Sequence, residues 1–442
     1  MVEWALLLAL GLLEGGSALK ASPPARLLPK PRVIAVRGRP HVFQLLDYEV
    51  SCLPGVHGVM ARKLALLCGY EGTSHLCAAN VPQLPAKAPS WTPEAASRGI
   101  VSCGGQLSRG GGGALPALAR VCSARHSKLT FHTPPLPPWM RDEPSGHVAA
   151  ALATGCVDIV EHPSVAEYNV ARAAAAAESN FVPQSCEWTY AEPGVAALGR
   201  AIGDWWLTRP GGGLDIPARL RTSARALDVV LPAGTGTAAL FLARHVPPGV
   251  TVHAVPCKGD ADALLQRMRY LDERSGSIGV FPRVLPPPPS HAVKFGGVAA
   301  PLLSSWRDAA ESGILLDLVY GPVAWAALEA CGWQPASAAG ADAGADAGAD
   351  AGADAGGSAG GGAGSGEGVG DVREVLYVNT GGHEGLEGQM LRYQRAGHLR
   401  KWRWQGSRPL AKGQWGVEEV LSEAKRIARI TAGLVHTRDA GL

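Results

Sequence analysis

Short apolar runs alternate with longer segments of helical periodicity between residues 100 and 177. The short runs are predicted to be buried strands, because continuous apolar stretches of this length are typical of strands covered on both faces. The longer segments repeat apolar residues at the spacing of one helix face, which predicts helices. Strands are therefore expected at residues 100–103, 129–132 and 157–160, and helices at residues 114–125, 147–153 and 165–177.

The same alternation resumes after Leu227. Repeated strand–helix–strand order predicts parallel sheets with helices on both faces. A chain of 442 residues with 46% hydrophobic content can fill two such lobes, so the fold class is predicted to be a two-lobed α/β fold. Ligands of these folds bind beyond the carboxyl ends of the strands, and a site is expected in the cleft there.

A low-complexity stretch interrupts the second half of the chain. Residues 336–370 consist of Ala-Asp-Ala-Gly repeats followed by Gly and Ser. This composition buries too little apolar surface to fold, so the stretch is expected to be a disordered insert. Because it lies between the apolar segments 313–320 and 373–380, it is predicted to lengthen one loop rather than to separate two domains.

Net charge and cysteine spacing limit the expected partners and the expected cellular compartment. The net charge is only +3 and the basic residues are dispersed, so neither nucleic acid nor a membrane is expected as a partner. The nine cysteines are scattered and never spaced Cys-x-x-Cys, which favours neither a disulfide framework nor a metal site. An intracellular location is therefore predicted, in the cytoplasm or in an organelle such as the mitochondrion or plastid.

The N-terminus has one feature that would favour secretion instead. Residues 4–13 form an apolar run that resembles the core of a signal peptide. The run lacks a preceding positive charge and is too short to span a bilayer. Residues 1–30 are therefore expected to be a leader or an N-terminal extension, with secretion the less favoured alternative.

The segment 227–240, LDVVLPAGTGTAAL, has the pattern of a phosphate-binding loop. Gly234 and Gly236 would let backbone N–H groups converge at the positive end of the following helix, and Thr235 and Thr237 add hydroxyl donors. An ordinary strand-to-helix turn also needs glycine, so this loop alone does not identify a ligand. A Rossmann-type nucleotide or S-adenosylmethionine site is one alternative, although its acidic residue would fall late.

Five further segments, read together with this loop, resemble one enzyme family. The segments read GVMARKLALL, SCGGQLS, FVPQ with AEPGVAALGRAI, ESGILLDLVYGPVAW and YVNTGGHEGLEGQMLRY. In their chain order they resemble the pyridoxal-phosphate enzymes of the aminocyclopropane-carboxylate deaminase and D-cysteine desulfhydrase family, over residues 32–399.

The resemblance implies a tryptophan-synthase-β-like fold (PLP fold type II) with pyridoxal 5'-phosphate between two lobes, and a homodimer. The larger, cofactor-binding lobe would comprise residues 31–75 and 181–405, the smaller lobe residues 76–180, and the tail residues 406–442. It also assigns site residues. Gly234, Thr235, Gly236 and Thr237 would bind the cofactor phosphate, Thr380 would meet the pyridine nitrogen, and Tyr320 would be the active-site tyrosine.

The implied reaction is an α,β-elimination or deamination of a small amino acid, such as the conversion of D-cysteine to pyruvate, ammonia and sulfide. The Thr380 match favours the desulfhydrase branch, and Gly321 stands where deaminases carry an acidic residue. Gln106 and Ser108 would bind the substrate carboxylate, with Ser108 also catalytic. That loop departs from the family pattern because its asparagine is absent and glycines follow at 110–113.

A second departure concerns the lysine that attaches the cofactor. Met60 occupies that position, and a thioether can neither form an imine nor carry a proton. Lys63 matches the family's second lysine, near the phosphate, and lies about 4.5 Å further along a helix. Ser185 and Cys186 likewise replace a usual Gly-Gly pair.

Three interpretations follow from these departures. The chain is a divergent enzyme that uses Lys63 as a catalytic and cofactor-binding residue, a non-catalytic protein that binds the cofactor or another metabolite, or the product of a coding sequence that is wrong at the Met60 segment.

Overall fold

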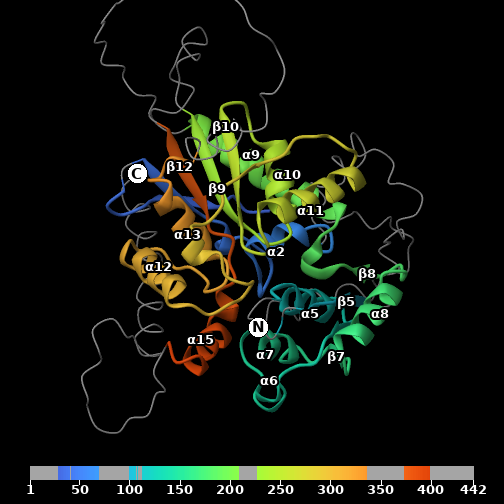
Figure 1. Ribbon diagram of the computed structural model, residues 1–442. Coiled ribbons are helices and arrows are strands. Elements are labelled where there is room, and N and C mark those ends of the chain that lie inside the picture. Colours follow the sequence, from blue (N-terminus) through green and yellow to red (C-terminus); the bar gives the residue numbers. More distant parts are fainter. Residues whose placement is uncertain are drawn as a thin grey trace, which may run out of the picture.

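The computed structural model describes residues 28–39, 41–68, 99–105, 107, 112–208, 226–335 and 373–398 (Figure 1). The predicted leader (residues 1–30) lies almost entirely outside these ranges. The insert at 336–370 and the tail at 406–442 lie outside them completely. No helix in the described ranges is both long enough and apolar enough to cross a membrane.

The larger sheet has six strands in the order β1-β2-β12-β9-β10-β11. All neighbouring pairs are parallel except β1 and β2, which are antiparallel. The central strand β9 pairs Val229 with Val252 of β10 and with Leu376 of β12. The strands span Arg32–Ala35 (β1), Val42–Leu46 (β2), Leu227–Ala233 (β9), Val250–Pro256 (β10), Arg283–Val284 (β11) and Glu374–Val378 (β12).

Helices cover both faces of this sheet, as Figure 1 shows with α12 and α13 on one side and α9, α10 and α11 on the other. Successive residues of β9 point to opposite faces, so Val229 and Val230 belong to two different apolar clusters. The helices span Glu192–Thr208 (α9), Thr237–His245 (α10), Ala261–Arg274 (α11), Ala300–Glu311 (α12), Gly321–Ala330 (α13) and Leu386–Arg395 (α15).

The smaller sheet has four parallel strands in the order β7-β6-β5-β8. Its strands span Ile100–Cys103 (β5), Leu129–Thr133 (β6), Val157–Glu161 (β7) and Phe181–Val182 (β8). Its helices span Ala114–Ala124 (α5), Pro138–Asp142 (α6), Gly146–Leu152 (α7) and Val165–Ala175 (α8). Two sheets, each with parallel strands and packed helices, confirm the predicted two-lobed α/β class.

The elements expected between residues 100 and 177 are all present. Their observed bounds differ from the expected ones by at most two residues, as the bounds of β5, α5, β6, α7, β7 and α8 show. This agreement has a local cause: each strand is a short apolar run and each helix repeats apolar residues on one face.

A compact segment links β2 to the rest of the larger lobe. It comprises η2 (Asp47–Glu49), the hairpin of β3 (Ser51–Leu53) and β4 (Val56–His57), and α2 (Gly58–Lys63). Remaining single 3-10 turns lie at Gln184–Cys186 (η5), Thr189–Ala191 (η6), Pro289–His291 (η8) and His383–Gly385 (η9).

A buried ion pair fixes α2 against this segment. The Nε and one terminal nitrogen of Arg62 both donate to Oδ1 of Asp47, at 3.1 and 2.9 Å. The two side chains are 1% and 0% exposed. Buried charges are costly unless they are paired, so each partner depends on the other.

Arg62→Met should lower the free energy of unfolding by about 3–5 kcal/mol, because the Asp47 carboxylate would remain buried without its cation. Urea denaturation of the variant measures this change. Arg32→Met is the matched control, since Arg32 pairs with Glu49 of the same 3-10 turn but the two side chains are 34% and 29% exposed. Its cost should stay below about 1 kcal/mol. Equal costs for the two variants would contradict the role given to the buried pair.

Candidate active site

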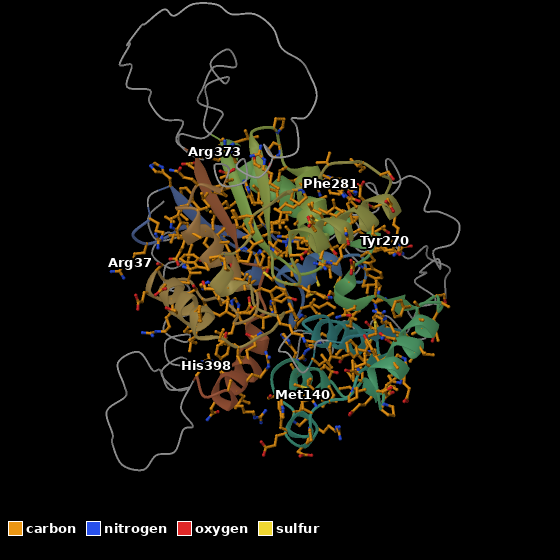
Figure 2. All side chains as sticks on the ribbon, in the orientation of Figure 1. Arg37, Met140, Tyr270, Phe281, Arg373 and His398 are labelled. Atoms are coloured by element: carbon orange, nitrogen blue, oxygen red, sulfur yellow. The ribbon has the colours of Figure 1, made fainter. Side chains whose placement is uncertain are left out.

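A cavity of about 140 Å³ lies at the carboxyl ends of the large sheet's strands. Figure 2 shows Arg373, which precedes β12, on the side of the large sheet that is away from the smaller lobe. Met140 marks the smaller lobe at the opposite end of the same view. Thr380, which follows β12, therefore faces the smaller lobe, and α5 of that lobe lines the cavity as well. The lining brings together Met60, Lys63, the loop from Gly234 to Thr237, Tyr320 and Thr380.

The loop between β9 and α10 contributes a helix N-terminus to the cavity. Gly236 has φ +84°, and a Cβ there would lie 2.4 Å from Cγ of Met268, so the position requires glycine. Within the described part of the chain, no side chain caps this helix. Oγ1 of Thr235 and Oγ1 of Thr237 lie 2.9 Å apart, and both residues line the cavity. Hydroxyls and N–H groups at a helix N-terminus form an arrangement that binds phosphate.

Tyr320 packs against this loop. A Cβ on Gly234 would lie 3.3 Å from the Tyr320 hydroxyl, which shows how closely the ring approaches the backbone. Asp317 holds the turn before α13, because its carboxylate accepts hydrogen bonds from the N–H groups of Val319 and Tyr320, both at 2.7 Å. Burial raises the pKa of Tyr320, so its hydroxyl is protonated at neutral pH and can donate a hydrogen bond.

Thr380 joins the end of β12 to the start of α2. The Val59 N–H donates to the Thr380 carbonyl at 3.1 Å. A Cβ on Gly58 would lie 2.3 Å from that carbonyl oxygen, and Gly58 has φ +60°. Glycine at position 58 therefore allows α2 to begin directly against the end of β12. This position of α2 brings Met60 and Lys63 to the cavity.

Met60 and Lys63 lie one helical turn apart in α2, and both line the cavity. The Lys63 side chain is buried, and its Nζ donates to the Ser185 carbonyl at 2.9 Å. Burial lowers the pKa of Lys63, because an ammonium group loses hydration there. The neutral amine, which is the nucleophilic form, is therefore more populated than in an exposed lysine.

The turn that receives Lys63 has a strained backbone. Ser185 and Cys186 have φ values of 60° and 51°, in the left-handed region that favours glycine. These are the two positions where the family named above usually has Gly-Gly. Trp188 supports the same turn, because its Nε1 donates to the Lys63 carbonyl at 3.3 Å. The backbone keeps a glycine-like conformation although the side chains are not glycine.

Several lining residues were not predicted as site residues, and they include His147, Asp317 and Gln389, whose polar side chains can act on a ligand. His147 lies at the start of α7, and a Cβ on Gly385 would lie 2.6 Å from its ring. The Gln389 side chain accepts a hydrogen bond from the Leu318 N–H at 2.7 Å, which ties α15 to the Asp317 turn. For His147, the available sequence signal was the Ser-Gly-His motif at 145–147. The family that the sequence resembles often has asparagine in place of this histidine.

The predicted substrate-binding residues cannot be placed in the same way. Gln106 and Ser108 lie outside the described residues, as do residues 109–111. The positions of Lys63, Met60, Gly234, Thr235, Gly236, Thr237, Tyr320 and Thr380 around one cavity are described, and their assigned roles remain predictions.

The chain as a whole aligns with several solved structures. An ACC deaminase homologue aligns with a TM-score of 0.48 and 14% identity, over 80% of this chain and 88% of that one. Serine racemase from maize aligns with a TM-score of 0.45 and 12% identity, over 84% and 93%. Diaminopropionate ammonia lyase from Escherichia coli aligns with a TM-score of 0.41 and 11% identity, over 80% of each chain.

No protein-family model and no curated protein sequence matches the chain. At these identities and TM-scores, the similar structures assign no activity to it. The α/β fold rests on the two sheets described above, and the chemistry must be argued from the cavity.

Ser185→Gly should raise the free energy of unfolding by about 1 kcal/mol, because glycine removes the cost of a left-handed residue. The carbonyl that accepts from Lys63 is unchanged. Ser312→Gly is the control, since Ser312 ends α12 with φ −79°, and its stability should fall by about 0.5 kcal/mol. Thermal and urea unfolding measure both variants, and a loss of stability in Ser185→Gly would contradict the strain at this turn.

Lys63 should make the stability of the cofactor-free protein depend on pH. Its pKa is lower in the folded than in the unfolded chain, so between these two values the unfolded chain binds more protons and stability rises with pH. The free energy of unfolding of the wild type, minus that of Lys63→Met, should therefore rise with pH until the pH reaches the ordinary lysine pKa of about 10.4. Lys30→Met, at a side chain that is 74% exposed, is the control. A difference independent of pH would contradict the burial of this amine.

Proposed function

We propose that this protein binds pyridoxal phosphate in the cavity and acts as a lyase or deaminase on a small amino acid. One observation carries the proposal: the buried amine of Lys63 and the threonine-rich loop at the N-terminus of α10 line the same cavity. An amine-reactive phosphate ester needs both groups in one place. Pyridoxal phosphate supplies an aldehyde that condenses with amines and a pyridine ring that accepts electrons.

The residues present fit such a group. The glycines at 234 and 236 let the loop backbone pack closely against Tyr320 and Met268, and the start of α10 has no side-chain cap among the described residues. Thr235 and Thr237 offer hydroxyls to a phosphate. Lys63 offers a primary amine whose pKa is lowered by burial. These features meet the two needs of the cofactor, a phosphate site and a nucleophile.

Three side chains of the protein can supply proton transfer and hydrogen bonds at this site. As a neutral amine, Lys63 can accept a proton from the substrate carbon and return it. The protonated Tyr320 hydroxyl, close to Gly234, can donate a hydrogen bond beside the phosphate loop. Thr380 lines the cavity, and its side chain carries a neutral hydroxyl rather than a charge. A neutral partner at the ring nitrogen would weaken the ring as an electron acceptor, which suits elimination of a good leaving group.

The finer proposal is a D-cysteine desulfhydrase-like α,β-elimination that yields pyruvate, ammonia and sulfide. It is supported by Thr380 and by Gly321, which follows Tyr320 and offers no acid for ring opening. A homodimer in an intracellular compartment is part of the same proposal.

A second candidate is a protein that binds the cofactor without turnover. Met60 supports it, because this thioether lines the cavity at the position where the family carries its lysine. The phosphate loop, Tyr320 and Thr380 need no lysine to make contact with a ligand, so binding could remain where catalysis is lost.

Borohydride reduction separates the two candidates. The purified full chain is mixed with pyridoxal phosphate, its visible absorbance is recorded, and the reduced protein is mapped by tryptic mass spectrometry. We expect the adduct on Lys63, which would then resist trypsin and remain joined to residues 64–87. Lys63→Arg should lose the adduct and lower sulfide release from D-cysteine by about 100-fold or more.

Lys258→Arg is the matched control, since Lys258 lines an adjoining pocket and should leave the Lys63 adduct in place. Cofactor binding without any lysine adduct would support the non-catalytic candidate, and Met60→Lys should then create an adduct at position 60. A chain that binds no pyridoxal phosphate would overturn both candidates.

A further inference from the structure

Cys52 and Cys68 lie at the two ends of the segment that carries Met60 and Lys63. Cys52 is the central residue of β3, and Cys68 follows α2 by five residues. Their Sγ atoms are 2.7 Å apart. A disulfide bond measures about 2.05 Å, so a small rotation of either side chain would bring the two sulfurs to bonding distance.

The backbone holds both cysteines in place. The Cys68 N–H donates to the carbonyls of Leu64 and Ala65, at 3.0 and 3.1 Å, which continues the turn after α2. Cys52 is 6% exposed and belongs to the main apolar cluster, while Cys68 is half-buried and packs against that cluster. The close approach therefore belongs to the packed part of the lobe rather than to an exposed loop.

We propose that Cys52 and Cys68 form a disulfide that closes the chain around β4 and α2. The inference concerns the polypeptide alone and does not depend on the proposed cofactor. Because Met60 and Lys63 lie inside the closed segment, the bond would tie both ends of the element that supplies the candidate lysine.

The bond forms by thiol exchange with a low-molecular-weight disulfide such as oxidised glutathione. The thiolate of the more exposed Cys68 attacks one sulfur of that disulfide and releases one glutathione thiolate. The Cys52 thiolate then attacks the Cys68 sulfur and releases the second glutathione. The protein loses two protons and two electrons, and the small disulfide is reduced to two thiols.

The exchange should be slow at neutral pH. The neighbouring Cys52 thiol and burial both raise the pKa of Cys68, so little thiolate is present. The rate of bond formation should therefore increase with pH. Once formed, the bond restricts the unfolded chain and should raise the melting temperature by roughly 3–8 °C.

Peptide mapping of the native full chain tests the proposal. The protein is incubated with oxidised glutathione, denatured, alkylated with iodoacetamide and digested with trypsin without reductant. Trypsin cuts after Arg62 and after Lys63, so the bond would join peptide 38–62, which contains Cys52, to peptide 64–87. We expect this joined pair, and we expect reduction to separate it.

Peptide 64–87 also contains Cys77, which lies outside the described residues. The joined pair should persist in Cys77→Ser and disappear in Cys68→Ser. Cys331, half-buried and hydrogen-bonded to the Leu328 carbonyl, should be alkylated as a free thiol.

The proposal is overturned if Cys52 and Cys68 are both alkylated after oxidation, if each carries a separate glutathione, or if the pair survives in Cys68→Ser. The peptide map of the wild-type protein tests the proposal by itself, so the test does not depend on whether the cysteine variants fold. The melting temperature of the oxidised protein should fall on reduction, and this difference should vanish in Cys52→Ser.

Discussion

The arrangement of the cavity depends on the contact between Gly58 and Thr380. A backbone carbonyl at the end of β12 lies where any larger residue at position 58 would place its Cβ. Because α2 begins at this point, the contact sets which side chains of α2 reach the carboxyl end of the sheet. The Arg62–Asp47 pair then fixes the other end of the same helix. These two contacts, one at each end of α2, thus determine where Met60 and Lys63 lie.

Burial gives Lys63 properties that its sequence position alone would not. The same removal of water that lowers its pKa also requires a partner for its protons, and the Ser185 carbonyl supplies one. That carbonyl is presented by a turn whose residues adopt the left-handed conformation. A buried amine, a strained turn and a cavity occur together here, as is common where a protein holds a ligand.

The sequence allowed prediction of features whose causes are local. Alternating apolar runs and helical periodicity predicted the parallel sheets, and the glycines at 234 and 236 predicted the loop at the start of α10. Long-range features could not be read in this way. The approach of Cys52 to Cys68 depends on how β3 and the turn after α2 pack, and His147 reaches the cavity from the smaller lobe. Gln106 and Ser108 stay untested, since they lie outside the described residues.

Changes in chain length between α13 and β12 enter the fold away from the cavity. Helix α13 starts beside Tyr320 and carries the chain about 15 Å along its axis over ten residues. β12 starts at Glu374 and returns the chain to the cavity at Thr380, a span of about 20 Å. A reporter peptide or a fluorescent domain introduced into the connection between α13 and β12 would therefore be joined to the fold at points away from the lining residues.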